Sequence, residues 1–478
     1  MVGCKSRNPQ PTKGPTLMHL TRTSTRQQHN RITDYRRTSD SYRFFNVLTS
    51  NELLDKVETL LPEHRERLYP PTETLSMFLA QAMSTDRSCQ NIVNQTSFKR
   101  LTGGLSDTST STGGYCRARQ RLPLAMISEL TGHLGHLIDA QSPEQWHWQG
   151  RRVRIIDGTT VTMPDTLANQ ADYPQQRGQQ PGLGFPICRL VGVTCLSSGA
   201  LLNAAIGRFN GKGGDEQTLL RTLQDTFQPG DIVMGDAFFS TYFFIADMHA
   251  KGVDILMEQQ GARRRNTDFR CGQRLGERDH LVRINKPKIR PDWMSQNQYD
   301  AAPASLLIRE CKVGKKIIVT TMCCPKTAPK AALKMLYKSR WHVELDIRHI
   351  KETMGMNVLS CKTPDMARKE IWTYLLSYNL IRLMMAQSAL LADITPRNMS
   401  FKHCLQLWLV GIQKITVMDE KMLNAFFLLM AQRRVGNRPG RIEPRAVKRR
   451  PKPFPLLTKQ RSQAREEIKI DGHPKKLK

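Results

Sequence analysis

Three acidic residues stand where the sequence pattern changes, and together they could bind divalent metal ions. Asp157 ends the β-branched run RRVRIID, Asp236 ends the short apolar run DIVMGD, and Glu344 lies in a stretch of helical periodicity. Mg²⁺ and Mn²⁺ prefer carboxylate oxygens as protein ligands. Two such ions, about 3.5–4 Å apart, can activate an attacking oxygen and stabilise a leaving one. The three acids therefore predict a site with two Mg²⁺ or Mn²⁺ ions.

Residues 330–354 are predicted to form one helix that carries Glu344 with other polar residues on the same face. Tyr337, Arg340, Glu344 and Lys351 lie at i, i+3, i+7 and i+14, which share a face at about 100° per residue. Arg348 falls on this face and is expected to pair with Glu344 at the i+4 spacing. The carboxylate suits a metal ion, and the cations suit phosphates beside it. The alternative is an ordinary surface ion-pair face.

Four other ionisable residues of this stretch are expected to have no role in a site. They are the helix acids Asp346 and Glu352, which lie off the proposed face, and the histidines His342 and His349, which have no second metal ligand nearby in the sequence.

The segment from 151 to 257 must position the two aspartates. Alternating β-branched runs predict three strands, with an Asp-Gly pair at 157–158 that could form a tight turn. A helix capped by Asp215 and Glu216, a strand, a second helix and a last strand follow. The order β-β-β-α-β-α-β is that of a ribonuclease H-like α/β fold, in which the strands ending in Asp157 and Asp236 are neighbours.

The remaining segments give the predicted domain organisation. Residues 150–257 form the first part of the ribonuclease H-like core, a β-rich insertion occupies 258–330, and the core helix with the catalytic glutamate lies in 331–362. Helical regions flank this core on both sides. The flanking parts are a basic arm at 1–43, a helical region at 44–138, a C-terminal helical region at 363–434, and a basic tail at 435–478.

The charge balance indicates a polyanionic partner. The chain has 72 Lys and Arg against 42 Asp and Glu, a formal net charge of +30. Residues 1–43 carry +7 and residues 433–478 carry +12, and both ends lack apolar periodicity. Nucleic acid is the commonest partner of such basic segments. The alternative for each end is a solvated tail without a partner.

The cysteine pattern and the hydropathy indicate a reducing, cytoplasmic location. Eleven cysteines are scattered without any C-x-x-C pair, which argues against a disulfide framework or a structural zinc site. The first residues, MVGCKSRNPQ, have no apolar signal region, and no run reaches about 18 apolar residues. No membrane association is expected.

One family combines these features. The set Tyr-x2-Arg-x3-Glu-x6-Lys, present as YKSRWHVELDIRHIK, resembles the signature of DDE transposases of the IS-four insertion-sequence family. IIDGTT and GDAFFS resemble the two aspartate motifs of that family, and RGQQPGLGFPICRLVG and GGDEQTLL resemble further blocks. The acids are separated by 79 and 108 residues, and the longer gap suits the β-insertion of that family. The resemblance covers roughly residues 115–390.

The resemblance implies a bacterial, DNA-associated enzyme that moves an insertion sequence by cut and paste. Asp157, Asp236 and Glu344 would bind two divalent ions, and water would hydrolyse a phosphodiester at the transposon end. The freed 3′-OH would attack the other strand to form a hairpin, and later the target DNA. The partners would be inverted-repeat ends, target DNA and a second copy of the chain in a homodimeric synaptic complex. The helical region at 44–138 would bind the DNA ends, and the C-terminal helical region at 363–434 could serve dimerisation.

Trp293, in the basic stretch KPKIRPDWMSQNQY, is a further candidate. Relatives that form a hairpin are thought to stack a flipped base on an aromatic side chain, and Trp293 is hypothesised to serve here. Tyr337, Arg340, Lys351 and Arg348 would complete the DNA contacts. The alternative for Trp293 is a local core residue. For the whole chain the alternatives are a degenerate relative that only binds ends and a junction resolvase of the same fold.

Overall fold

The computed structural model consists of two compact units, Met1–Ser39 with Thr49–Met126, and Asp40–Leu48 with Ile127–Lys478. The basic arm predicted at 1–43 and much of the basic tail fall outside the described residues. The structure describes residues 44, 47–48, 50–63, 68–102, 109–211, 213–411, 418–436 and 457–473.

The smaller unit is helical. Its helices are α3 (Asn51–Leu60), α4 (Pro71–Met83), α5 (Cys89–Thr102) and α6 (Gly113–Arg121), followed by the start of α7 (Leu124–Gln141). α4, α5 and α6 pack around Tyr69, Met77, Ile92, Val93, Tyr115 and Ala118. A buried arginine, Arg119, lies 5.0 Å from the rings of Phe78 and Tyr115 and donates to Gln81 Oε1.

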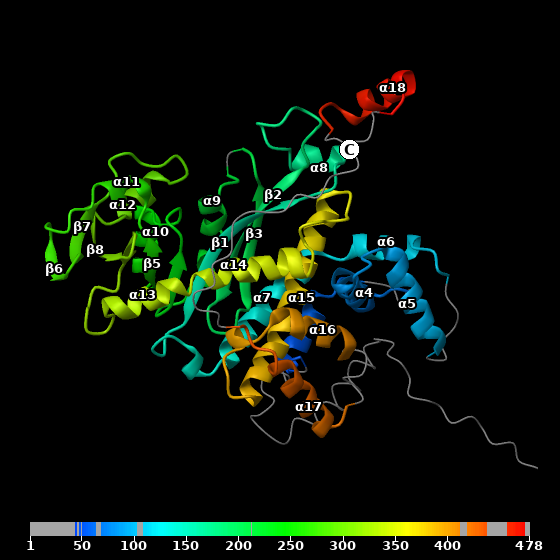
Figure 1. The fold of residues 1–478 in the computed structure, drawn as a ribbon, viewed down its shortest axis with the longest axis horizontal. Helices are drawn as coiled ribbons and strands as arrows, with labels where there is room; N and C mark the ends of the chain where they lie inside the picture. Colours follow the sequence, from blue (N-terminus) through cyan, green and yellow to red (C-terminus); the bar gives the residue numbers. More distant parts are fainter. Residues whose placement is uncertain are drawn as a thin grey trace, which may run out of the picture. The chain divides into compact units, whose positions relative to one another are not determined.

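The larger unit is built on one mixed sheet of nine strands in the order β3-β2-β1-β4-β5-β9-β8-β7-β6 (Figure 1). β1 pairs with β4, and β4 with β5, in parallel, and the other pairs are antiparallel. The strands are β1 (Val153–Thr162), β2 (Ile187–Cys195), β3 (Leu201–Arg208), β4 (Ile232–Gly235), β5 (Asp254–Glu258), β6 (Gln273–Gly276), β7 (Asp279–Asn285), β8 (Ser305–Val313) and β9 (Lys316–Thr320). The expectation of a mixed α/β fold with flanking helices is confirmed.

Helices cover both faces of this sheet. α9 (Glu216–Arg221) and α10 (Tyr242–Ala250) pack on one face, in a core with Ile156, Val233 and Ile255. α13 (Lys330–Lys338) and α14 (Trp341–Arg348) follow one another across the other face, in a core with Ile155, Met234 and Leu256 (Figure 1). The alternation of these core residues along each strand explains why both faces are apolar. The element order expected over 151–257 is found with one addition, because the short helix α8 (Leu167–Asp172) lies between β1 and β2.

The remaining helices complete the larger unit. The long helix α15 (Pro364–Leu391) is buried along most of its length against α16 (Phe401–Gly411), α17 (Glu420–Ala431) and β3. Shorter helices are α8 (Leu167–Asp172), α11 (Gly261–Arg265) and α12 (Gln296–Ala301), and α18 (Arg461–Asp471) lies within the predicted tail. Within the described residues, no helix has both the length and the apolarity needed to cross a bilayer.

Two local predictions were wrong. The turn expected at Asp157 and Gly158 is absent, because β1 runs straight through both residues and pairs with β2 along its length. The single helix expected at 330–354 is divided into α13, α14 and a π-helical turn at His349–Thr353. At the first division, Ser339 and His342 bond to carbonyls three residues back, to Leu336 and Ser339, as in a 3₁₀ turn.

Candidate active site

Asp157 and Asp236 occupy equivalent positions on neighbouring strands. Val153 lies opposite Ile232 and Ile155 opposite Met234 in the parallel ladder of β1 and β4. The same offset carries Asp157 to Asp236, which directly follows the last residue of β4. Neighbouring strands lie about 4.8 Å apart, and residues in register point to the same face. The ladder therefore brings together the two aspartates that the sequence separates by 79 residues.

The Asp157 carboxylate is half-buried and crowded by negative charge. Burial raises the pKa of Asp157 to about 6, and the charges of Asp236 and Glu344 act in the same direction. The Gly158 N–H, which donates to Asp157 Oδ1 at 2.8 Å, and the Arg340 guanidinium oppose this rise. Among its neighbours, Asp157 thus interacts electrostatically with both other predicted metal ligands.

The junction of α13 and α14 brings Arg340 and Glu344 to the aspartates. Arg340 Nη2 donates to Glu344 Oε1 at 2.6 Å, and Arg340 Nη1 lies 3.8 Å from Asp157 Oδ2. Glu344 therefore pairs with Arg340 one turn before it, and not with Arg348 as the spacing suggested. Arg348 is exposed on α14.

Tyr337 and Lys351 point toward the same two strands. Tyr337 is buried with its hydroxyl 3.5 Å from the Gly235 carbonyl, and burial raises the pKa of this phenol. Lys351 Nζ donates to the Thr160 carbonyl at 2.8 Å and to Thr159 Oγ1 at 3.2 Å, and burial lowers the pKa of this ammonium. All four residues of the predicted face thus lie near the ends of β1 and β4, although the helix that carries them is interrupted.

Glu216 is a fourth acid beside these strands, and the sequence reading assigned it only to a helix cap. Asp215 does cap α9, because its Oδ1 accepts from the Thr218 N–H. Glu216 instead packs over Gly158, where an added Cβ would lie 2.4 Å from the Glu216 carboxyl carbon. Burial raises the pKa of Glu216, Arg189 lowers it, and the charge of Asp236 raises it. The block GGDEQTLL was the only signal for this position.

Asp346 was wrongly expected to be an ordinary helix acid. Its side chain is fully buried beneath α14, where it bonds to Arg382, and both its oxygens accept from Arg397 Nη1 at 2.7 and 2.8 Å. Arg382 and Arg397 follow in α15 and in the loop after it. This ion-pair network fixes α14 to the rest of the larger unit, two residues beyond Glu344.

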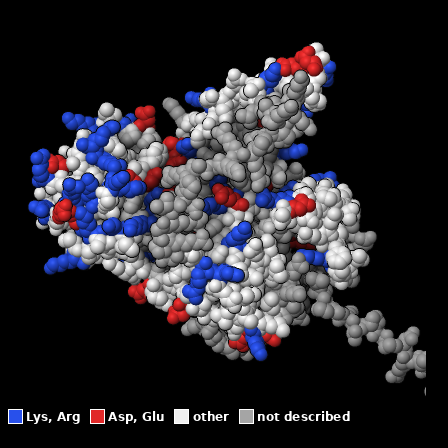
Figure 2. Space-filling model, in the orientation of Figure 1, with Lys and Arg blue, Asp and Glu red and all other residues white. Residues whose placement is uncertain are grey.

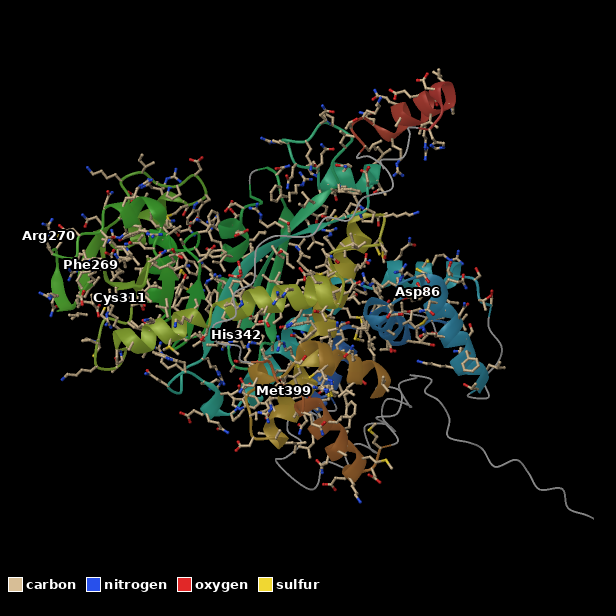
Figure 3. The ribbon with its side chains drawn as sticks, viewed as in Figure 1. Asp86, Phe269, Arg270, Cys311, His342 and Met399 are labelled. Atoms are coloured by element: carbon tan, nitrogen blue, oxygen red, sulfur yellow. The ribbon has the colours of Figure 1, made fainter. Side chains whose placement is uncertain are left out.

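The two histidines of this region also pack internally. His342, labelled in Figure 3, lies on α14, where burial and the nearby Arg397 lower its pKa to about 4. His349 stacks on the Phe401 ring at 4.5 Å, and burial lowers its pKa to about 3. Both are neutral near pH 7, as expected for histidines that serve packing.

Trp293 lies on the opposite face of the sheet, against α9 and α10. The guanidinium of Arg221 lies 4.0 Å from its ring centre, and Phe243 makes an edge contact at 6.1 Å. Almost half of the side chain, 45%, is exposed. Trp293, Arg221 and Phe239 line a small open pocket with residues of both helices. Trp293 is thus neither a buried core residue nor in contact with Glu344.

The donor set of the three predicted ligands fits a hard divalent cation, because all three supply carboxylate oxygens in a half-buried, negatively charged site. In the present arrangement of the described side chains, no three His, Cys, Asp or Glu residues surround a point where a metal ion would fit. The guanidinium of Arg340 lies between Asp157 and Glu344 and accounts for this spacing.

Comparisons with known proteins find similarity to transposases. A family model described as "Transposase DDE domain" matches residues 148–380. The transposase InsG for insertion sequence element IS4 of Escherichia coli is 27% identical over 356 residues, which cover 72% of this chain and 78% of that protein. A solved piggyBac transposase synaptic complex with hairpin DNA covers 85% of this chain and 87% of its own, but at 10% identity and a TM-score of 0.41 this likeness carries no argument. Over residues 148–380, which include the acids at the ends of β1 and β4 and on α14, the chain is therefore similar to DDE transposases, and over most of its length it is similar to the IS4 transposase.

Proposed function

We propose that this transposase moves its element by cut and paste, with Asp157, Asp236 and Glu344 holding two Mg²⁺ or Mn²⁺ ions. The observation that carries the proposal is the common register of the two aspartates on β1 and β4, with Glu344 joined to Asp157 through Arg340. The family is one of metal-dependent enzymes that cut and transfer DNA.

The core of the larger unit is best read as ribonuclease H-like. Three antiparallel strands are followed by two parallel ones in the spatial order β3-β2-β1-β4-β5, with helices on both faces. In this arrangement the first and fourth strands are central neighbours. The two aspartates therefore come from the middle of the sheet, where β1 and β4 each have a neighbouring strand on either side.

Each side chain has a defined task in this proposal. When bound, the divalent ions would activate the attacking oxygen and stabilise the leaving one. Arg340 and Lys351 would hold the phosphates next to the scissile bond, since both cations face the strand ends that carry the aspartates. Lys351 is already fixed to β1 by two hydrogen bonds, so it requires little reorganisation.

The insertion carries a basic surface. Residues 259–330 contain sixteen Lys and Arg against six Asp and Glu. Figure 2 shows these cations gathered over the part of the molecule that carries α11 and β6 to β8. Arg263 is engaged by the buried Glu310, whereas Arg265 in the same helix is exposed. This surface would follow a DNA backbone by charge, without reading its sequence.

Trp293 would stack a base that is displaced during hairpin formation. Its exposed ring, held in place by Arg221 and Phe243, supports this role because the ring is fixed yet accessible. Its position on the face of α9 and α10 means that a displaced base would have to reach around the strand ends.

The helical regions supply the remaining partners in this proposal. The region 44–138 would bind the inverted-repeat ends, since α5 and α6 have no acidic residue and carry five Lys and Arg. The C-terminal region 363–434 would pair two copies of the chain. α16 and α17 expose apolar side chains suited to such an interface, among them Val410, Met422 and Leu428.

The test is a reconstituted reaction with purified protein, a DNA duplex ending in the inverted repeat of the element, and Mg²⁺. Nicking at the repeat, a hairpin product and insertion into a second DNA would be observed if the proposal holds. End binding without any nicking would instead identify a degenerate relative that blocks transposition. Cleavage of four-way junctions in preference to repeat ends would identify a resolvase.

A further inference from the structure

Arg340 occupies the space between two proposed metal ligands. One of its terminal nitrogens donates to Glu344 Oε1 at 2.6 Å, and the other lies 3.8 Å from Asp157 Oδ2. The side chain is mostly buried, with 16% exposed, and so are its partners. The second Asp157 oxygen already accepts the Gly158 N–H. The guanidinium thus contacts the oxygens that a bridging cation would need.

A cation at this position reduces the electrostatic repulsion among the carboxylates of the site. Asp157, Glu344 and Asp236 interact as like charges in a half-buried setting, where repulsion is stronger than in water. Without a metal ion, a guanidinium between two of them offsets that repulsion. A carboxylate oxygen that binds a divalent ion at about 2.0–2.6 Å cannot keep the same lone pair on Arg340.

We infer that Arg340 is an internal substitute for the divalent cation. The Arg340 side chain leaves the carboxylates when metal binds, and it is then free to hold a DNA phosphate. The inference rests on the proposed function of Asp157 and Glu344. Its consequence is that metal and DNA end bind cooperatively, because each ligand favours the same displaced position of Arg340. Arg340 is a positioning residue in this scheme, with separate partners before and after metal binding.

The location of Arg340 suits such a movement. It is the last residue before α14 and follows Ser339, the C-cap of α13, where the helix is interrupted. Its backbone N–H bonds to the Tyr337 carbonyl at 3.1 Å, so the backbone is fixed and only the side chain has to turn. A long, flexible side chain at a fixed Cα can reach either the carboxylates or a phosphate beside them.

The first measurement is the affinity of the full chain for Mn²⁺ without DNA, with the free ion detected by electron paramagnetic resonance. Arg340→Ala is expected to bind Mn²⁺ about tenfold more tightly than the unaltered protein, within the usual range of coupling between two sites. Arg340→Gln keeps a long polar side chain and should show the same gain in Mn²⁺ affinity. It replaces Arg340→Ala if that variant does not fold. Lys338→Ala is the matched control, because it removes an exposed cation two residues away, and its Mn²⁺ affinity should be unchanged.

The second measurement is the affinity for a pre-cleaved DNA end with and without Mn²⁺. In the unaltered protein Mn²⁺ should strengthen end binding about tenfold by the same linkage, and in Arg340→Ala this factor should fall close to one. Equal Mn²⁺ affinity of Arg340→Ala and the unaltered protein, or an equal gain in Lys338→Ala, would overturn the inference. Glu344→Gln distinguishes failure of this inference from failure of the proposed function. If Glu344→Gln leaves Mn²⁺ binding intact, the proposed set of metal ligands is itself wrong.

Discussion

The buried carboxylate of Asp346 should stabilise the fold and the active site together. It bonds to Arg382, which is itself fully buried, and to Arg397 through both oxygens. Replacement by Asn keeps the shape but removes the charge, and leaves two guanidinium groups without their counter-ion. Removing one partner from a buried ion pair costs about 3–5 kcal/mol. At about 2–4 °C per kcal/mol, Asp346→Asn should lower Tm by about 10 °C.

The assay is thermal unfolding, paired with nicking measured well below the lowered Tm. Because Asp346 holds α14 two residues beyond Glu344, nicking should also slow in the folded variant. Glu352→Gln is the control, since this acid of the same segment is exposed and its loss should change stability by less than about 0.5 kcal/mol. An Asp346→Asn variant with the same Tm as the unaltered protein would refute this reasoning.

Acid should act on the same network. Burial tends to raise the pKa of Asp346, but Arg397 and Arg382 outweigh it and hold that pKa below its ordinary value. A carboxyl whose pKa is depressed by folding stabilises the protein above its unfolded pKa of about 3.9. This contribution should be present at neutral pH and be lost as the pH falls through the lowered folded pKa. The difference in Tm between Asp346→Asn and the unaltered protein should therefore shrink below pH 4.

Four further outcomes are expected. Asp236→Ala and Glu344→Ala should each abolish nicking but keep end binding in a gel-shift assay, and normal cleavage by either would exclude its proposed role. Lys351→Ala should raise KM for the DNA end more than it lowers kcat, because its ammonium is placed to hold a phosphate. Since burial raises the pKa of Asp157 to about 6, and metal binds its ionised form, Mn²⁺ affinity should fall below pH 6 and level off above it. Trp293→Ala should slow hairpin formation and spare the first nick, whereas equal loss of both steps would count against base stacking.

Residue types and local periodicity sufficed to predict where the acids lie. Asp157 and Asp236 each follow an apolar run, and the order of strands and helices around them decides that these runs are neighbours. The side chains of Tyr337, Arg340 and Glu344 still face the same strands despite the interruption between α13 and α14, because all three residues lie within about two turns of it. For these residues the placement could be predicted from short segments, whereas their catalytic role stays a prediction.

Partners from distant segments could not be predicted. The buried state of Asp346 depends on Arg382 and Arg397, which lie 36 and 51 residues later, and no local pattern distinguishes it from an exposed helix acid. The Asp-Gly pair at 157–158 has a strong turn preference, yet continuous pairing with β2 keeps β1 extended there. Gly158 instead leaves room for the Glu216 side chain, which approaches the strand closely.

The pairing of β9 with β5 gives the insertion a protective role apart from DNA. Without residues 259–330, β5 would become the outer strand of the remaining mixed sheet, with unpaired N–H and C=O groups flanked by the apolar Leu256 and Met257. Such an edge invites pairing with another chain and aggregation. A shortened transposase of this type would therefore need another segment to cover β5, so the insertion can vary in length and sequence only as long as one strand continues to shield that edge.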